Sequence, residues 1–374
     1  MPNAIIAGYI RSPFTPARKG GLANVRPDDL AAETIRALVV RTQVNPEHIE
    51  DIKLGCAFPE GEQGLNMGRL VAFIAGLPIG VAGVTINRFC GSSMQAIHDA
   101  AGAIAAGAGE VFICAGVESM SRVPMTGFNP LPNPALYEKY PEAYEAMGIT
   151  AENVAAQYKQ KRKKLEEFAL ESQQKATSAQ KTGRLKDEIA PIAGVSEDGC
   201  IRADTTLAGL AELKPAFDKN GIITAGVSSP LTDGAVALLV VSEDYADRHK
   251  LPKLARIKSM AVSGCKPEVM GLGPIAASTK ALARAGLSMK DMDIVELNEA
   301  FASQSLAVIQ ELGIDEKKLN LDGGAIALGH PLGASGGRIT GKAASLLVRE
   351  GKRYALATMC IGGGQGIATV LEKI

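Results

Sequence analysis

The segment NRFCGSSMQAIHDAAGAIAAG (residues 87–107) places Cys90 immediately before the start of an Ala-rich helix. The first backbone N–H groups of a helix have no partner within the helix, and the helix dipole makes that end positive. Both effects lower a thiol pKa, so the segment predicts a Cys90 thiolate near neutral pH. The alternative is that Cys90 is a small buried apolar residue, the commonest fate of a free cysteine.

Composition limits what kind of protein this is. The chain has 374 residues, 46% of them hydrophobic, which is enough for a large core and predicts two or more domains. Lys plus Arg and Asp plus Glu number 40 each, which argues against nucleic acid or an anionic membrane as the main partner. The six cysteines form no CxxC pair and the four histidines show no zinc spacing, so no metal site is expected.

The expected location of the protein rests on targeting signals that the sequence does not show. The N-terminal stretch MPNAIIAGYIRSPF has neither a secretory nor an organelle-targeting pattern. No apolar run is long enough to span a membrane, and the C-terminal VLEKI is not a peroxisomal signal. We therefore expect a cytoplasmic protein without membrane insertion, and free cysteines are in keeping with a reducing compartment.

Short apolar runs alternate with Ala-rich helical stretches, which indicates an α/β protein. Two segments recur later in the chain at nearly one offset. Residues 45–58 resemble 288–301 at a shift of 243, and residues 91–104 resemble 333–346 at a shift of 242. Generic Ala/Gly helix patterns would explain either match alone, but their shared order and shift favour an internal duplication.

The middle of the chain differs from both halves. We expect an inserted loop domain at 118–231, a first half formed by 1–117 with 232–252, and a second half at 253–374. The inserted segment contains the run KRKK (161–164), followed by glutamates. This run is interpreted as a solvated helix face, with phosphate binding as the alternative.

Three further segments carry chemical groups. His330 lies in the glycine-rich LDGGAIALGHPLGASGGR (321–338), and histidine is the usual base for a cysteine nucleophile. Cys360 ends an apolar strand in MCIGGGQG (359–366), which on its own could be a tight turn or a weak phosphate loop. Asn298 and Glu299 interrupt an apolar run at a strand end, where a polar pair often lines a site.

Five segments together resemble the thiolase family, in the same order and over essentially the whole chain. They are NRFCGSSMQAI (87–97), GVESMSRVPM (116–125), NEAFA (298–302), GGAIALGHPLGASG (323–336) and CIGGGQG (360–366). The resemblance implies two similar βαβαβαββ halves packed in five layers, α-β-α-β-α, with a loop domain inserted in the first half. Within the family the chain is most similar to degradative 3-ketoacyl-CoA thiolases.

The resemblance also implies roles for individual residues. Cys90 matches the acylated nucleophile, His330 the base that activates it, and Cys360 the group that moves a proton on and off the acetyl α-carbon. Asn298 matches the residue that holds a water, which with His330 forms one oxyanion hole. The backbone N–H groups of Cys90 and Gly362 match the donors of the second oxyanion hole.

Contacts with coenzyme A carry over from the family to a further set of positions. These are Arg202, Phe217, Ala225, Ser229, Met147 and Phe301. Ordinary loop packing is the alternative for Phe217 and Ala225. One departure from the short-chain biosynthetic enzymes is Ala146, which stands where they have a histidine, and we expect it to leave room for longer acyl chains.

The expected activity is thiolysis of 3-ketoacyl-CoA to acetyl-CoA and a shortened acyl-CoA, as in fatty acid β-oxidation, with coenzyme A as substrate and no metal or redox cofactor. The nearest alternative is an acetoacetyl-CoA thiolase working in the condensing direction. Cys360 argues against a ketoacyl synthase, and the presence of Cys90, His330 and Cys360 together argues against a non-catalytic CoA or lipid carrier. Expected partners are a second copy, in a homodimer or homotetramer, and a dehydrogenase/hydratase subunit of β-oxidation.

Overall fold

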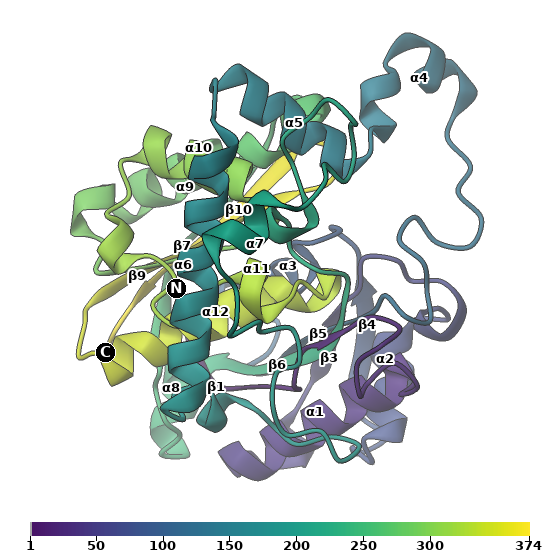
Figure 1. Cartoon of the computed structure of the whole chain (residues 1–374). Coiled ribbons are helices and arrows are strands. Elements are labelled where there is room, and N and C mark those ends of the chain that lie inside the picture. The colour runs from purple at the N-terminus through teal and green to yellow at the C-terminus, as the bar shows by residue number, and fades with distance from the viewer. Residues whose placement is uncertain (1) are drawn as a thin grey trace.

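The chain folds into two halves that follow the same order of strands and helices. The computed structural model describes residues 2–374 (Figure 1). The first half contains β1 (Ala4–Arg11), α1 (Pro27–Thr42), β3 (Asp51–Gly55), α2 (Met67–Ile74), β4 (Ala82–Ile86), α3 (Ser92–Ala105), β5 (Val111–Ser119) and β6 (Thr232–Ser242). The second contains β7 (Ala255–Gly264), α9 (Gly273–Ala285), β8 (Ile294–Leu297), α10 (Ala302–Leu312), α12 (Leu332–Arg349), β9 (Tyr354–Ile361) and β10 (Gln365–Glu372).

The strand order shows the relation between the halves. Strands run β4-β3-β5-β6-β1 in the first half and continue β7-β10-β9-β8 in the second. The two halves have the same strand order when it is counted outward from β1 in the first half and from β7 in the second. The two halves join through a short antiparallel pairing of β1 with β7 at Ile5 and Ile6. A single parallel bridge from Val295 to Leu319 stands where β4 pairs with β3 in the first half. This symmetry supports the predicted duplication.

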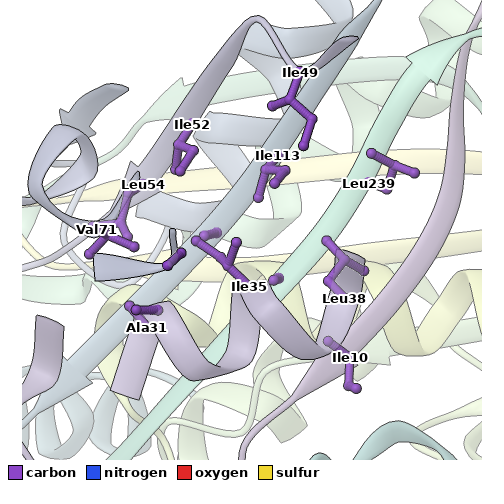
Figure 2. Packing of buried hydrophobic residues seen from close by; sticks show 14 of the residues in the cluster. Ile10, Ala31, Ile35, Leu38, Ile49, Ile52, Leu54, Val71, Ile113 and Leu239 are labelled. Atoms are coloured by element: carbon purple, nitrogen blue, oxygen red, sulfur yellow. The ribbon is translucent and has the colours of Figure 1, made fainter. Parts of the chain in front are cut away.

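Three apolar clusters define five layers, as expected. Helices α1 and α2 cover the outer face of the first β layer, where Ile35 and Leu38 pack near Ile113 and Leu239 (Figure 2). Helices α3 and α12 lie between the two β layers, and α9 and α10 cover the outer face of the second. The central helices are therefore enclosed by sheet on both sides. No helix within residues 2–374 is long and apolar enough to cross a membrane.

The segment between β5 and β6 has its own helices: α4 (Pro134–Lys139), α5 (Met147–Gln157), α6 (Arg162–Lys181) and α7 (Leu207–Ala211). In Figure 1 α4 lies on an arm that extends from the body. The domain boundaries at 117/118 and 231/232 stay a prediction. The run KRKK opens α6, where Lys161, Lys163 and Lys164 are exposed and Arg162 pairs with Glu166 at 2.7 Å. The remaining short elements are β2 (Thr15–Pro16), α8 (Glu243–Arg248) and α11 (Ala325–Leu328).

Helices α3 and α12 approach each other through positions with little or no side chain. A Cβ atom on Gly336 would lie 2.7 Å from the backbone nitrogen of Met94, closer than non-bonded atoms tolerate. The backbone N–H of Gly337 donates to Ser93 Oγ at 2.7 Å. On the other side of α3, a Cβ on Gly55 of β3 would lie 2.3 Å from the nitrogen of Ser93. Glycine is therefore required at these contacts, and the abundance of Gly and Ala in the sequence has a packing cause.

The close crossing of α3 and α12 predicts that replacing two helix glycines by alanine changes the free energy of unfolding in opposite directions. Gly336→Ala is expected to lower the free energy of unfolding by about 1–3 kcal/mol, because the added methyl group meets the backbone of α3. Gly102→Ala, on the exposed face of α3 with open space around it, should raise the free energy of unfolding by about 0.5–1 kcal/mol. Chemical denaturation of both variants measures this, and equal effects would show that the crossing is looser than described.

Candidate active site

Cys90 lies in a tight turn just before α3, whose N-cap is Gly91. The preceding residue, Phe89, has a φ of +42°, in the left-handed region that a bulky side chain rarely adopts. Ser92 holds this turn: its hydroxyl donates to the Phe89 carbonyl at 2.6 Å and accepts from the Arg88 N–H at 2.9 Å. The strained turn presents Cys90 at the helix mouth, as the sequence predicts.

The predicted thiolate at Cys90 is wrong for the free enzyme. Burial raises the pKa of the Cys90 thiol to about 12, although part of the residue remains exposed. Hydrogen bonds from the backbone N–H groups of Gly362 and of Cys90 itself lower this pKa, and the Glu118 carboxylate raises it. Neither N–H group belongs to α3, because those of Gly91 and Ser92 donate to the carbonyls of Arg88 and Phe89, and the loss of solvation is the larger effect. Cys90 rests as a neutral thiol.

His330 lies just before α12, whose N-cap is Pro331. Its Nδ1 is 2.6 Å from Ser335 Oγ, and the Ser335 hydroxyl donates to the Pro331 carbonyl at 3.0 Å. Because that hydroxyl proton is already used, Nδ1 carries the hydrogen and Nε2 is the unprotonated, basic nitrogen. Burial, and next the charge of Arg338, lower the pKa of His330 to about 3, so the ring is neutral at physiological pH.

The residues Asn298 and Glu299, which follow β8, point to different parts of the structure. Asn298 Nδ2 lies 3.4 Å from His330 Nε2, and its Oδ1 is buried without a hydrogen-bond partner within residues 2–374. Glu299 instead accepts hydrogen bonds from Ser172 Oγ at 2.6 Å and Asn320 Nδ2 at 2.8 Å. Of the predicted polar pair, Asn298 faces His330 and Glu299 anchors neighbouring segments.

Cys360 is the penultimate residue of β9 and is only 1% exposed. Burial raises its pKa well above the ordinary value, and the next largest contribution comes from the charge of Cys90. The two thiols are thus close enough to influence each other's ionisation. The following turn contains Gly363 and Gly364 at φ values of +77° and +82°, which glycine adopts readily. It directs the Gly362 N–H at Cys90 Sγ.

Most of the residues expected to contact coenzyme A lie near this turn. The Phe217 and Phe301 rings meet edge to face, with centroids 5.9 Å apart. Met147 Sδ would lie 3.5 Å from a Cβ placed on Gly362. The Ser229 N–H and hydroxyl both donate to the carbonyl of Ala300, next to Phe301, at 3.0 and 3.1 Å.

The remaining two residues expected to contact coenzyme A are Ala225 and Arg202. Ala225 is exposed at the start of a short 3-10 helix. Arg202 lines a cavity of about 370 Å³ along α6, together with Lys181 and Thr205, and its N–H donates to Gln173 Oε1 at 2.8 Å. Phe217 and Phe301 do not line this cavity.

Comparisons with known proteins identify the family of the chain. The family model described as Thiolase, N-terminal domain, matches residues 4–244, and Thiolase, C-terminal domain, matches residues 251–373. The chain is 48% identical to a 3-ketoacyl-CoA thiolase of Vibrio cholerae and 45% identical to one of Bacillus subtilis, each match covering 100% of both chains. It also matches the crystal structure of human mitochondrial 3-ketoacyl-CoA thiolase in complex with CoA, with a TM-score of 0.92, 39% identity, and coverage of 100% of this chain and 98% of that one. The chain belongs to the thiolase family.

Sequence reasoning missed two residues beside the site. Ser335 fixes the His330 tautomer, and its position five residues later, in the first turn of the following helix, was an available signal. Glu118 influences Cys90 from a strand far away in sequence. The segment that contains it, GVESMSRVPM, is one of those that resemble the thiolase family. The hydrogen-bond partners of Glu118 lie in other segments and could not be predicted from this one.

The neutral resting thiol predicts how Cys90 reacts with iodoacetamide. Because only the thiolate is alkylated and the pKa is about 12, the alkylation rate should rise about tenfold per pH unit from pH 7 to pH 10. Mass spectrometry of the labelled peptide at each pH measures this, with Cys90→Ser as the control for labelling elsewhere. A rate that levels off near pH 7 would show that Cys90 is a thiolate at neutral pH, as the sequence predicts.

Proposed function

We propose that this protein is a CoA-dependent acyltransferase that cleaves 3-ketoacyl-CoA with the thiol of coenzyme A, giving acetyl-CoA and an acyl-CoA shortened by two carbons. The observation that carries the proposal is the convergence of two thiols, one of which, Cys90, packs against a small apolar cluster that includes Leu332, two residues after His330. Cys90 comes from the first half, whereas Cys360 and His330 come from the second. The relatives named 3-ketoacyl-CoA thiolase support this assignment and do not favour the acetoacetyl-CoA alternative.

The first stage forms an acyl-enzyme. His330 Nε2 takes the Cys90 proton while Sγ attacks the 3-keto carbon, because neither group is charged beforehand. The bond between carbons 2 and 3 then breaks, leaving the shortened acyl group on Cys90 and an acetyl-CoA enolate. Cys360 donates its proton to the enolate carbon, and acetyl-CoA leaves.

In the second stage coenzyme A takes the acyl group. Its thiol attacks the Cys90 thioester, and the displaced Cys90 sulfur recovers the proton that His330 took in the first stage. Cys360 is reprotonated by the incoming thiol. Since one thioester replaces another, little energy is lost and the chemistry is reversible. The scheme assigns no step to a metal or redox group, and coenzyme A is a substrate.

Two groups of donors are proposed to stabilise negative charge on oxygen. The Gly362 and Cys90 N–H groups, which now point at Cys90 Sγ, lie where a thioester oxygen on that sulfur would accept from them. Protonated His330 and a water held by Asn298 would serve the enolate oxygen. The unpartnered Oδ1 of Asn298 supports the water position, because a buried acceptor without a partner is costly.

For coenzyme A we propose a route that begins at Met147, against the Gly362 turn, and continues along Phe217, which packs on Gly148, to Phe301 and Ser229. Ala225 would extend the route at the surface. Arg202 is proposed to serve the nucleotide end, and its position along α6 makes this the least supported of the contacts.

The protein is further proposed to act in the cytoplasm as a homodimer or homotetramer, with a dehydrogenase/hydratase subunit as another partner. Strand β4 is the outermost strand of the sheet, and exposed apolar side chains gather on the segment around it: Leu65 (88%), Phe73 (48%), Ile79 (77%) and Val84 (38%). Pairing of β4 with the same strand of a second copy would cover this edge. That apolar edge supports the homo-oligomer.

Acyl chain length should separate the two thiolase activities. Ala146, exposed at the N-cap of α5 beside Met147, replaces a bulkier histidine and leaves space for additional methylenes. Each methylene that becomes fully buried should contribute about 0.8 kcal/mol, so kcat/KM is expected to rise about fourfold per methylene from four-carbon substrates toward eight- to ten-carbon substrates. Steady-state thiolysis across chain lengths measures this, with Ala146→His expected to reduce the slope. A strong preference for acetoacetyl-CoA would favour the condensing enzyme.

The two cysteines should have separable functions. Cys90→Ala is expected to abolish both acetylation by acetyl-CoA and thiolysis, since the nucleophile is gone. Cys360→Ala should still acquire acetyl on Cys90, because His330 remains, while thiolysis falls by about 10²–10⁴-fold. Mass spectrometry of the acetylated peptide and thiolysis rates measure the two steps. Near wild-type thiolysis in Cys360→Ala would show that Cys360 is only a turn residue.

A further inference from the structure

Glu118, the penultimate residue of β5, is a buried carboxylate with only 2% exposure. Its Oε2 accepts from the Ala57 N–H at 2.8 Å and from the Gly333 N–H at 2.9 Å. Its Oε1 accepts from the Phe58 N–H at 3.2 Å and from Gln63 Nε2 at 2.9 Å. Burial raises the pKa of Glu118, and these four N–H donors lower it, which is how a buried anion is tolerated; the Cys56 thiol is a fifth donor, to Oε1 at 3.8 Å.

These donors come from both sides of the active site. Ala57 and Phe58 follow β3, and the Phe58 ring lies 5.8 Å from the ring of Phe89, the strained residue that precedes Cys90. Gly333 is in the first turn of α12, which begins two residues after His330. One carboxylate thus joins the support of the nucleophile to the helix that carries the base, across the boundary between the two halves.

We propose that Glu118 is a positioning residue that holds Cys90 and His330 at their working separation, an inference that rests on the proposed function. The negative charge at the N-terminus of α12 is favoured by the helix dipole and by the unpaired N–H groups there. The bidentate contact fixes the first turn of α12 against the segment after β3. Relative movement of these two parts would change the approach of Nε2 to the Cys90 proton, and a misplacement of about 1 Å costs about 100-fold in rate.

The charge of Glu118 has a second effect. Across the part of the chain that the structure describes, no Lys or Arg forms an ion pair with it. Its charge therefore acts on the neighbouring thiols, Cys56 at 3.8 Å and Cys90, and raises the pKa of each. The other ionisable group that interacts with Cys90 is Cys360 from β9. Glu118 thus helps to keep Cys90 protonated until substrate arrives.

Two substitutions separate position from charge. Glu118→Asp keeps the charge but is one methylene shorter, so it cannot reach Gly333 and the Ala57–Phe58 segment together. We expect kcat to fall about 10–100-fold, with KM and the pH profile of Cys90 alkylation close to wild type. Glu118→Gln keeps the length but removes the charge. We expect a lower kcat and an alkylation rate at a fixed alkaline pH that is about tenfold higher, corresponding to one unit of thiol pKa.

Glu188→Gln is the matched control, because Glu188 is also buried and pairs with Arg11 and Lys342, each at 2.8 Å, away from Cys90. It should lower stability while leaving kcat and the alkylation profile unchanged. Wild-type kcat in Glu118→Asp, or an unshifted alkylation profile in Glu118→Gln, would overturn the proposal. If Glu118→Gln does not fold, the kcat of Glu118→Asp decides. Acetylation of wild-type Cys90 by acetyl-CoA is measured alongside, because its failure would contradict the proposed function and not the role of Glu118.

Discussion

The close crossing of α3 and α12 is the contact on which the rest of the structure depends. The two helices lie at the centre of the molecule, between two β layers, and touch where Gly336 leaves no room for a side chain. Each begins beside a reactive residue, Cys90 in one case and His330 in the other. A looser crossing would move Cys90 and His330 apart. The glycines and other small residues of α3 and α12 therefore determine the geometry of the site.

Burial has a chemical consequence at this crossing. Cys90 is partly and His330 almost wholly removed from water, and both groups are held in their neutral forms. A free thiolate is therefore scarce, and the proton is expected to move as the substrate binds and reacts. The fixed N–H groups of Gly362 and Cys90 take the place of solvent for charge that develops later. The site is thus arranged for the reacting state and not for a charged resting state.

Much of the fold and site could be predicted from the sequence, for different physical reasons. The repeat near an offset of 243 reflects two segments that share one hydrophobic pattern, and β3 and β8 occupy the expected equivalent positions. Cys90, His330 and Cys360 were predicted because reactive side chains stand beside glycines, and Asn298 because it interrupts an apolar run; their catalytic roles stay predictions. The ionisation of Cys90 could not be found in this way, because a helix start is local whereas desolvation comes from segments distant in the sequence. The partners of Glu118 were hidden for the same reason.

The central claim is that Cys90 carries the acyl group while Cys360 moves the α-proton of acetyl-CoA. Exchange of the acetyl-CoA methyl protons with deuterium oxide, followed by NMR, tests it directly. The account predicts exchange in the wild-type protein and its loss in Cys360→Ala, because no group is left to remove the proton. Exchange at the wild-type rate in Cys360→Ala would contradict it.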